Sequence, residues 1–405
     1  MRIVLVTICY PPEIRSISNM VREFAEELVQ RGHAVTVLTG WPQYNLSEED
    51  RQRVFITDSV ENGVRVLRIK TLPTHKVPYI IRGIGQVFLP FLFLRAFKKY
   101  VRDSVDAVVV YSPHLPLTKV GTAIKKQYGA RYILNIQDIF PQNAIDLGVL
   151  KNKMLIRYFE DMERRAYAAA DVVTTCTENA RQFLTTRKGL SEAKVMCVPN
   201  WIDIRQYARA GARGVYRKKY NLGNRFVLLF PGIFGPSQGL DFVIEVARRV
   251  ADLTDICFLF VGDGTEKEKI QALTKKYHCA NVQFELFVSL HEFPRLLQDA
   301  DVGLLALKHD SGTPTVPGKF FGFLAARLPV LGFLNKESEG HRLIQESGCG
   351  YSCLSDDVGQ AEALVRTMYG KRGQLSDFGE KGFAYVQKHF SKKGCIDKLE
   401  KLLHS

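Results

Sequence analysis

The stretch Thr313–Gly332, TPTVPGKFFGFLAARLPVLG, joins a Pro-Gly turn to a helix and then to a short apolar strand. A turn that leads into a helix N-terminus is a natural seat for a phosphate group, because backbone N–H groups point outward there. Lys319 stands where a cation would strengthen that contact. Gly322 is unexpected, since an acidic residue in the first turn would also suit the helix dipole. The stretch therefore indicates a turn–helix–strand unit with an anion site at its turn.

Short apolar strands alternate with amphipathic helices on both sides of this stretch. In the second half of the chain the expected strands read RFVLLF, ICFLFV, VQFELF and DVGLLAL. The first half shows the same pattern with RIVLVTI, HAVTVLTG, VDAVVVYSP and ARYILNIQD. Such alternation is typical of doubly wound parallel sheets. We therefore predict an α/β chain with two Rossmann-like domains that face each other across a cleft.

The domain boundaries follow from this pattern and from the basic polar stretch RQYARAGARGVYRKKYNLGN. A chain of 405 residues is too long for one core, so two domains are expected. We predict a first domain over residues 1–205 and a second over residues 206–384. Residues 385–405 are predicted to form a C-terminal helix that packs back on the first domain.

The eight cysteines are scattered and include no C-x-x-C pair, so neither a disulfide framework nor a zinc site is indicated. The opening residues MRIVLVTICY are apolar and β-branched, and a Pro-Pro follows them. They are therefore read as a first buried strand rather than as a signal peptide. These features lead us to expect a protein of the reducing cytosol with no bound metal.

The formal net charge of +14 indicates an anionic partner. Residues 62–102 contain no acidic residue and include GIGQVFLPFLFL, which is too short to span a bilayer as a helix. The basic aromatic segment over about residues 76–102 can lie in the interfacial plane of an anionic membrane, although a core helix with solvated flanks is the alternative. The basic residues expected at the membrane are Lys76, Arg82, Arg95, Lys98 and Lys99.

Ligands of parallel α/β sheets bind outside the carboxyl ends of the strands. Three loops at successive strand exits of the second half favour a phosphate. Glycines let backbone N–H groups approach a pyrophosphate, while a cation such as Lys319 neutralises its charge. A glycine-rich turn without a ligand and a solvated lysine are the alternatives for any one loop. The candidates for a nucleotide-diphosphate site are Gly232, Gly235, Gly262, Asp263, Pro317, Gly318 and Lys319.

The ordered set FPGIFGPSQGLDFVIEVA, FLFVGDGTEKEKI, DADVGLLAL, VPGKFFGFLAARLPVLG and GHRLIQESGCGYSC resembles the donor domain of GT-B glycosyltransferases. It is most similar to the family-4 retaining enzymes of bacterial surface-polysaccharide assembly, in the subgroup of colanic-acid and L-fucosamine transferases. In the first half, YPPEIRSISNMVREFAEELVQRGHAVTVLTGWPQY and QDIFPQNAIDLGVL resemble acceptor-domain signatures of that subgroup.

The resemblance implies sugar transfer from a nucleotide-diphosphate donor to an acceptor hydroxyl, with retention at the anomeric carbon and without an obligatory metal. A UDP-sugar is the expected co-substrate, and the expected acceptor is a saccharide on a polyprenyl diphosphate at the cytoplasmic face of the membrane. No further cofactor is implied. Lys319 and the helix that starts near Gly239 are the candidates that stabilise the departing diphosphate.

The chain departs from the family pattern at several positions. Gln238 replaces a basic residue that holds the diphosphate in many relatives. The first loop, with Glu13, Arg15 and Ser16, replaces a glycine-rich loop, and Arg15 could reach a phosphate or be a solvated arginine. Asp138 follows Gln137 where relatives often carry a His-Asp pair. It is the candidate that activates or orients the acceptor hydroxyl, with a helix cap as the alternative.

Two ribose-binding glutamates of the family are also missing. Alignment on the PGK motif puts Pro314 and Gly322 at their positions. Another group therefore binds the ribose, or donor affinity rests on the phosphate and base. Glu339 is an acidic candidate for the donor site, although a solvated loop glutamate is the commoner case.

Two other functions compete with glycosyl transfer. Sugar-nucleotide 2-epimerases share the architecture, but they need acid and base groups at the sugar and have no use for a membrane segment. A nucleic-acid-binding protein would explain the charge alone, yet the chain shows no recognisable nucleic-acid module. We therefore expect a nucleotide sugar, a lipid-linked saccharide and an anionic membrane surface as partners, and no nucleic acid.

Overall fold

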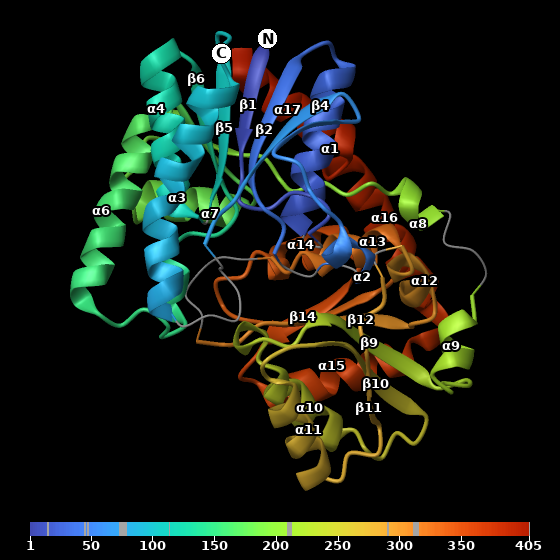
Figure 1. The fold of residues 1–405 in the computed structure, drawn as a ribbon. Coiled ribbons are helices and arrows are strands. Elements are labelled where there is room, and N and C mark those ends of the chain that lie inside the picture. Colours follow the sequence, from blue (N-terminus) through green and yellow to red (C-terminus); the bar gives the residue numbers. More distant parts are fainter. Residues whose placement is uncertain are drawn as a thin grey trace. The chain divides into compact units, whose positions relative to one another are not determined.

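The computed structural model describes residues 1–13, 16–43, 46, 48–72, 79–112, 114–208, 213–289, 291–310 and 316–404. The chain divides into two compact units. The first contains Met1–Asn200 and Cys395–Ser405, and the second contains Trp201–Gly394. Each unit is a largely parallel sheet with helices on its faces (Figure 1). The predicted pair of Rossmann-like folds is confirmed.

In the first unit, eight strands of the described residues form one sheet in the order β3-β4-β2-β1-β5-β6-β7-β8. All neighbours are parallel except β3 and β4. The chain runs outward from β1 to β2 and later returns to the other side of β1 at β5, so the switch point lies between β1 and β5. The strands are β1 (Arg2–Val6), β2 (Ala34–Gly40), β3 (Asp58–Glu61), β4 (Val64–Ile69), β5 (Ala107–Ser112), β6 (Arg131–Ile136), β7 (Val172–Thr175) and β8 (Val195–Cys197).

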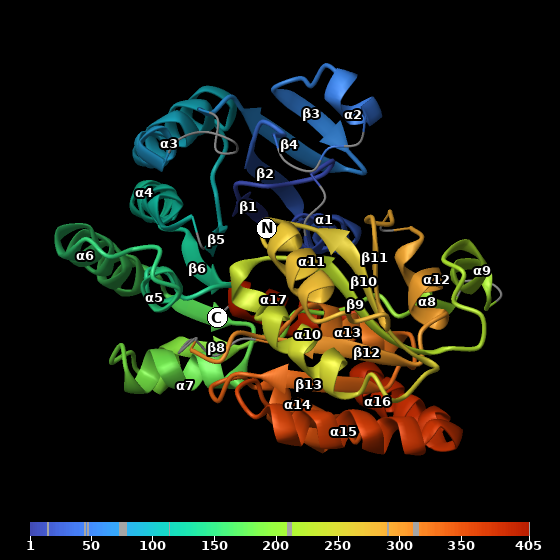
Figure 2. The ribbon, with the colours of Figure 1, turned by 90° about the horizontal axis from the view of Figure 1, so that it is seen from below.

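Three helices, α3, α4 and α6, lie side by side on one face of this sheet, and α4 packs against both of the others (Figure 2). Their buried apolar side chains share one core with the strands. Gly121 lets α4 approach closely, because a Cβ there would lie 2.6 Å from the Tyr132 ring. The helices of the unit are α1 (Ser16–Gln30), α2 (Glu48–Gln52), α3 (Tyr79–Tyr100), α4 (Thr118–Tyr128), α5 (Gln142–Asp146), α6 (Lys153–Ala169), α7 (Glu178–Thr186) and α17 (Lys392–His404), with 3-10 turns η1 (Leu115–Leu117) and η2 (Glu192–Lys194).

In the second unit, the described residues form a six-stranded sheet in the order β11-β10-β9-β12-β13-β14, and every pair is parallel. The switch point lies between β9 and β12, where the chain returns to the centre after β11. The strands are β9 (Phe226–Ile233), β10 (Ile256–Asp263), β11 (Val282–Glu285), β12 (Val302–Ala306), β13 (Val330–Leu334) and β14 (Gly350–Leu354).

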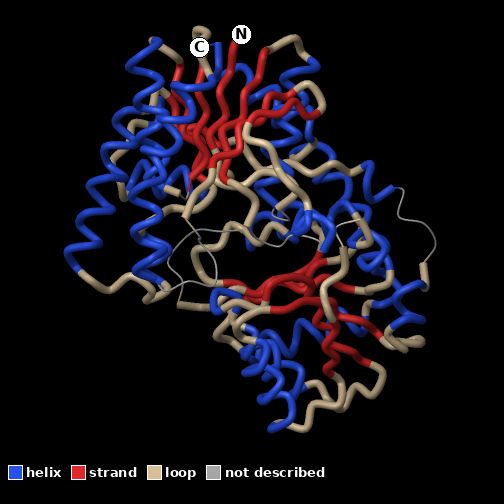
Figure 3. The backbone as a smooth tube through the Cα atoms, in the orientation of Figure 1, coloured by secondary structure: helices blue, strands red, loops and turns tan. Residues whose placement is uncertain are grey.

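Helices cover both faces of this second sheet, as the tube in Figure 3 shows. Apolar side chains on the two faces form two separate cores, because each buried strand presents apolar residues to both sides. The helices are α8 (Arg205–Ala208), α9 (Val215–Lys219), α10 (Leu240–Arg249), α11 (Lys267–Lys276), α12 (Phe293–Gln298), α13 (Lys319–Ala325), α14 (Gly340–Ser347), α15 (Val358–Gly370) and α16 (Leu375–His389), with 3-10 turns η3 (Pro236–Gln238) and η4 (Arg372–Gln374).

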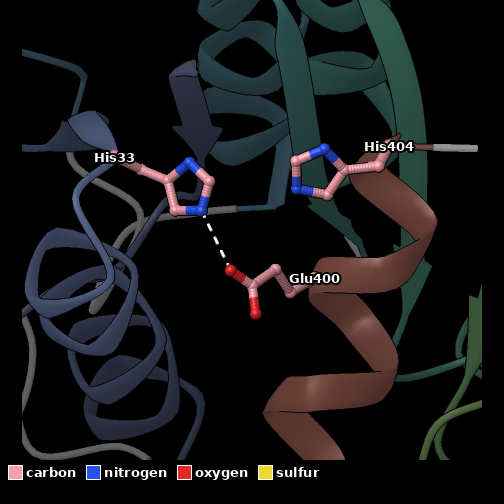
Figure 4. Close-up of side chains that lie close together, drawn as sticks. All are labelled: His33, Glu400 and His404. Carbon is pink, nitrogen blue, oxygen red and sulfur yellow. Dashed lines mark hydrogen bonds and ion pairs between the residues drawn. The ribbon is translucent and has the colours of Figure 1, made fainter.

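The C-terminal helix α17 belongs to the first unit and is tied to the start of β2 by polar contacts. A hydrogen bond of 2.9 Å joins His33 Nε2 to Glu400 Oε1, and His404 lies beside them (Figure 4). Potential metal-ligand atoms of these three residues lie within 4.8 Å of one another. The Glu400 carboxylate, however, also accepts from Arg31, which forms a 2.7 Å ion pair with Asp397. The group therefore works as a polar clamp between α17 and the unit it closes.

This clamp predicts a pH-dependent contribution to stability. Burial acts to raise the pKa of Glu400, but hydrogen bonds from His33 and Arg31 outweigh it and hold the pKa below its usual value. A depressed carboxyl pKa gives stability that is present above the unfolded pKa and is lost as the pH falls through the folded pKa. We expect Glu400→Gln to lower the free energy of unfolding by about 1 kcal/mol at neutral pH, as for a partly exposed pair.

Urea unfolding at neutral pH and near pH 3 measures this difference. The loss should shrink at the lower pH, because a larger fraction of the wild-type carboxyl is then protonated. Glu160→Gln on α6, an exposed glutamate, is the matched control. An equal loss at both pH values would contradict the clamp.

Candidate functional site

The exits of β9 and β10 are brought together by glycines. Gly262 pairs with Gly232 in the sheet register, and a Cβ on Gly262 would lie only 1.8 Å from the Gly232 carbonyl oxygen. Gly232 itself has φ +123°, a conformation that favours glycine. The two strands therefore end in bare backbone at the edge where ligands of such sheets bind.

The loop after β9 leads directly to the N-terminus of α10. Gly235 has an ordinary φ of −109°, so the backbone does not require glycine there. Gly239 has φ +56° and precedes α10 without a side-chain cap. The N-cap therefore supplies no side-chain acceptor to the first turn of this ten-residue helix, and the Asp241 carboxylate accepts from the Phe242 N–H at 3.2 Å. Uncapped N–H groups at a helix N-terminus can bind anions.

Lys319 lies at the β9–β12 switch point. Its Nζ donates a 3.2 Å hydrogen bond to Gln238 Oε1 and stands 3.4 Å from the centre of the Phe230 ring. A Cβ on Gly232 would approach the same Nζ at 3.9 Å. Burial lowers the pKa of Lys319 well below the usual lysine value, because no carboxylate among the described residues offsets its desolvation. The structure thus brings Gly232, Gln238 and Lys319 together around a desolvated amine.

The other donor-site candidates have different surroundings. Asp263 is exposed, and its carboxylate accepts from the Gly264 N–H at 3.0 Å and pairs with Lys267 at 3.4 Å. Pro317 is buried and Gly318 exposed, and both precede the short helix α13.

Glu339 is not the solvated loop residue of the commoner case. Its side chain is only 4% exposed and forms an ion pair with Arg342 one helical turn later. Burial acts to lower the pKa of Arg342, but the hydrogen bonds that its guanidinium donates to Glu346 and Glu339 raise that pKa above its usual value. Arg342 lies on α14, so Glu339 is anchored at the start of that helix. Its contact with a donor remains a prediction.

Gly322 points into the protein's own packing. A Cβ there would lie 3.1 Å from Tyr207 Oη on α8 and 3.4 Å from Phe293 on α12. Gly322 is buried, and the neighbouring Tyr207 phenol has its pKa raised by burial. A side chain at this position would therefore have to displace the Tyr207 phenol, which is a steric reason for the absence of a glutamate.

This packing predicts the effect of enlarging residue 322. Gly322→Ala should lower the free energy of unfolding by about 1–3 kcal/mol, the usual cost of overpacking. Tyr207→Phe removes the closest atom, so it should relieve most of that loss in the double variant. Urea unfolding of the four proteins in this cycle makes the measurement. Gly370→Ala is the control, because a Cβ there meets nothing within 4 Å. Additive losses in the double variant would show that Tyr207 does not fill this space.

In the first unit, Asp138 follows β6 and is exposed. Its side chain is in contact with water, but the surrounding protein atoms disfavour the charged form and raise the pKa of its carboxyl above the usual value. The preceding Gln137 is held firmly, since it donates to Asn135 Oδ1 at 2.5 Å and accepts from Asn200 Nδ2 at 2.8 Å. These amide contacts fix the strand exit that carries Asp138.

In the first loop, which follows β1, the structure describes the surroundings of Glu13. Glu13 is buried, and its carboxylate accepts from the Gln43 backbone N–H at 2.7 Å. Arg15 lies outside the described residues, and Ser16 begins α1. The proposed phosphate contacts of this loop remain predictions.

The acid-free segment contains β4 and, after it, the helix α3, which has both buried and exposed apolar side chains. Leu89, Phe93 and Phe97 are buried in the core, whereas Val87, Phe88 and Phe91 are 60%, 52% and 60% exposed. No helix in the described parts of the chain combines the length and hydropathy needed to cross a bilayer.

Some of the basic residues that were predicted to contact a membrane lie outside the described part of the structure. Arg95, Lys98 and Lys99 are exposed on α3. Lys76 lies outside the described residues, and Arg82 is in α3 with a side chain that is not described.

Sequence reasoning missed two side chains next to the candidate donor site. Phe230 supports Lys319 from within β9, and Tyr207 packs against Gly322. A phenylalanine inside an apolar strand reads as ordinary core, so no sequence signal distinguished it. Tyr207 lies in a short polar stretch far from α13 along the chain, and only folding brings the two together.

Family models match both halves of the chain. Residues 16–201 match the glycosyl transferase 4-like domain, and residues 213–383 match the glycosyl transferases group 1. Together these matches span most of the sequence. The chain therefore belongs to the family-4 glycosyltransferases of the GT-B fold, as its motifs predicted.

Individual relatives agree with this assignment. The protein named "Putative colanic acid biosynthesis glycosyl transferase WcaI" of Escherichia coli K12 is 26% identical over 335 residues, which cover 80% of this chain and 81% of the relative. The sucrose-phosphate synthase of Thermosynechococcus elongatus aligns with a TM-score of 0.77 at 14% identity, covering 100% of this chain and 98% of that one. Anabaena HepE in complex with UDP aligns with a TM-score of 0.72 at 13% identity over 100% of both chains. The two structures share the fold.

Proposed function

We propose that this glycosyltransferase moves a sugar from a nucleotide-diphosphate donor to a lipid-linked saccharide, with retention of anomeric configuration. The observation that carries the proposal is the amine of Lys319, which stands at the β9–β12 switch point beside Gln238 and the bare backbone of Gly232. Burial deprives the Lys319 ammonium group of hydrating water. A bound diphosphate would stabilise its positive charge in place of that water.

A UDP-sugar is the proposed donor. The HepE structure holds UDP in the same fold, which supports a uridine nucleotide without identifying the sugar. We propose an N-acetylated amino sugar or a deoxy sugar, in line with the surface-polysaccharide enzymes that the motifs resemble. Gly235, Gln238 and the α10 N-terminus would contact the phosphates, while Glu339 is a further candidate contact.

The proposed transfer breaks the bond between the anomeric carbon and the diphosphate oxygen. The acceptor oxygen forms its bond to that carbon on the same face of the sugar. Lys319 and the α10 N-terminus stabilise the negative charge that develops on the departing diphosphate. Asp138 orients the acceptor hydroxyl and accepts its proton, a role that suits a carboxyl with a raised pKa. No metal is needed in this scheme, so a chelator should leave the rate unchanged.

The proposed setting is bacterial surface-polysaccharide synthesis, such as O-antigen, capsule or exopolysaccharide, on the inner face of the cytoplasmic membrane. The name of WcaI, a colanic acid biosynthesis enzyme, supports this setting. The acceptor would be a saccharide on a polyprenyl diphosphate, and α3 would contact the bilayer that holds it. Sugar-nucleotide 2-epimerisation is not favoured, because both family matches and the WcaI relative are glycosyltransferases.

The lowered pKa of Lys319 predicts that nucleotide binding is coupled to the uptake of a proton. The diphosphate raises the amine pKa that burial has lowered, so binding above the free-state pKa takes up a proton. Affinity for UDP should therefore fall as the pH rises through this range. Calorimetry in buffers of different ionisation enthalpy measures the uptake.

Two substitutions separate charge from titration at Lys319. Lys319→Met should weaken UDP binding by roughly 10- to 100-fold, the worth of a hydrogen bond to a charged group. Lys319→Arg keeps the charge without titrating, so its proton uptake should vanish. Uptake that is equal in Lys319→Arg and the wild type would remove this amine from the site.

Asp138 predicts a specific loss of transfer rate. Asp138→Asn should lower kcat by roughly 10²- to 10⁴-fold, the usual worth of general base catalysis, while UDP affinity stays unchanged. The wild-type rate should fall as the pH drops through the raised Asp138 pKa, and this acidic limb should disappear in the variant. The assay follows labelled sugar from UDP-sugars onto lipid-linked saccharides, and NMR of the product gives its anomeric configuration. Asp146→Asn on α5 is the control, and a fully active Asp138→Asn would exclude the proposed role.

A further inference from the structure

A second exposed apolar surface lies on the same face of the first sheet as α3. It is formed by the N-terminal half of α6 and the loop before it. Met154 and Leu155 are 82% and 49% exposed. The same surface includes the exposed side chains Leu147, Val149 and Tyr158. The fold leaves all of these apolar side chains in contact with water. Exposed apolar side chains gathered in this way mark an interaction surface.

A groove of about 340 Å³ adjoins this surface between α4 and α6. Tyr158 belongs to both the apolar surface and the groove wall. The basic side chains Lys119, Lys126 and Arg165 line the groove together with hydroxyls of α4. Ammonium, guanidinium and hydroxyl groups are the partners that a phosphate head group prefers.

The charges around the groove are strongly biased. Neither α3 nor α4 contains an acidic residue. On α6, Asp161 lines the groove but is paired with Arg164 and Arg165, and Glu163 is buried against Lys188. Glu160 is the exposed exception. The face formed by α3, α4 and α6 therefore combines exposed apolar side chains with net positive charge.

We propose that the surface of α3, α4 and residues 147–158 docks on an anionic phospholipid bilayer. The apolar side chains at the start of α6 enter the interface, and the α4–α6 groove receives a lipid phosphate. Charge complementarity favours a bilayer over a second copy of this chain, whose matching face carries the same positive charge. The inference deepens the proposed function, because it names the face that meets the acceptor's membrane and adds α6 and α4 to α3.

Sedimentation of the full chain with vesicles tests this surface. The probes are vesicles of phosphatidylcholine alone and of phosphatidylcholine mixed with phosphatidylglycerol. The wild type should bind the mixed vesicles and bind the neutral ones only weakly. Equal binding to both would overturn the proposal, as would stable dimerisation without vesicle binding.

Matched pairs of substitutions by glutamate test the apolar and the basic parts of this surface. Met154→Glu/Leu155→Glu should reduce binding to mixed vesicles at least tenfold, whereas Leu286→Glu/Phe287→Glu, an exposed apolar pair in the second unit, should not. Each basic side chain near an anionic surface contributes about fivefold in affinity, so Lys119→Glu/Lys126→Glu should lose at least about 20-fold. Lys275→Glu/Lys276→Glu on α11 is its control. Unchanged binding in either test pair would overturn the proposal.

Fluorescence quenching measures whether the start of α6 inserts into the bilayer. Leu155→Trp should be quenched by brominated lipid, whereas native Trp41 and Trp201 serve as internal references. No quenching at residue 155 would overturn the insertion of α6.

An assay of sugar transfer onto the lipid-linked acceptor in detergent micelles distinguishes the proposed transferase function from the proposed docking surface. Variants that lose vesicle binding but retain transfer in micelles would support both. A wild type that binds vesicles but transfers no sugar would overturn the proposed function and leave the docking surface standing. A wild type that transfers sugar but ignores vesicles would overturn the docking surface alone.

Discussion

The parallel pairing of β9 with both β10 and β12 is the constraint on which the second unit depends. Parallel strands need long crossovers, so the chain must return through helices and can place every strand exit on one edge. The return to β12 after β11 opens the switch point at which Lys319 meets the β9 exit. Glycines at positions 232 and 262 allow the two central strands to end in close contact. Backbone geometry thus decides where charge can be placed.

The electrostatics of this edge depend on a desolvated amine. Lys319 has a carboxamide and an aromatic ring as its described neighbours, rather than a carboxylate. A paired lysine would be neutralised before any ligand arrived, whereas this amine gains most when an anion binds. Gln238, which replaces a basic residue of many relatives, accepts from the amine and orients it. The departure from the family pattern therefore has a structural use.

The sequence predicted some features well, and others only in part. Strand exits were predictable because buried parallel strands read as apolar runs ended by glycine, as in the stretches that contain Gly232 and Gly262. The α3 helix shows why periodicity was insufficient. It is apolar all round, so its sequence alone could not separate the buried Phe93 from the exposed Phe91. The buried side of α3 agrees with the core-helix alternative, and its contact with a membrane remains a prediction.

By itself, the sequence determined the fold class, the family and the loops that end the strands, since these depend on local pattern and short motifs. Tertiary structure decided which side chains share a space. Gly322 has no acid because Tyr207 and Phe293 fill its surroundings, and Glu339 is buried because Arg342 pairs with it. The exposed start of α6 also emerges only from packing. Partners distant in the chain meet through close-packed three-dimensional contacts, which no local pattern of residues records.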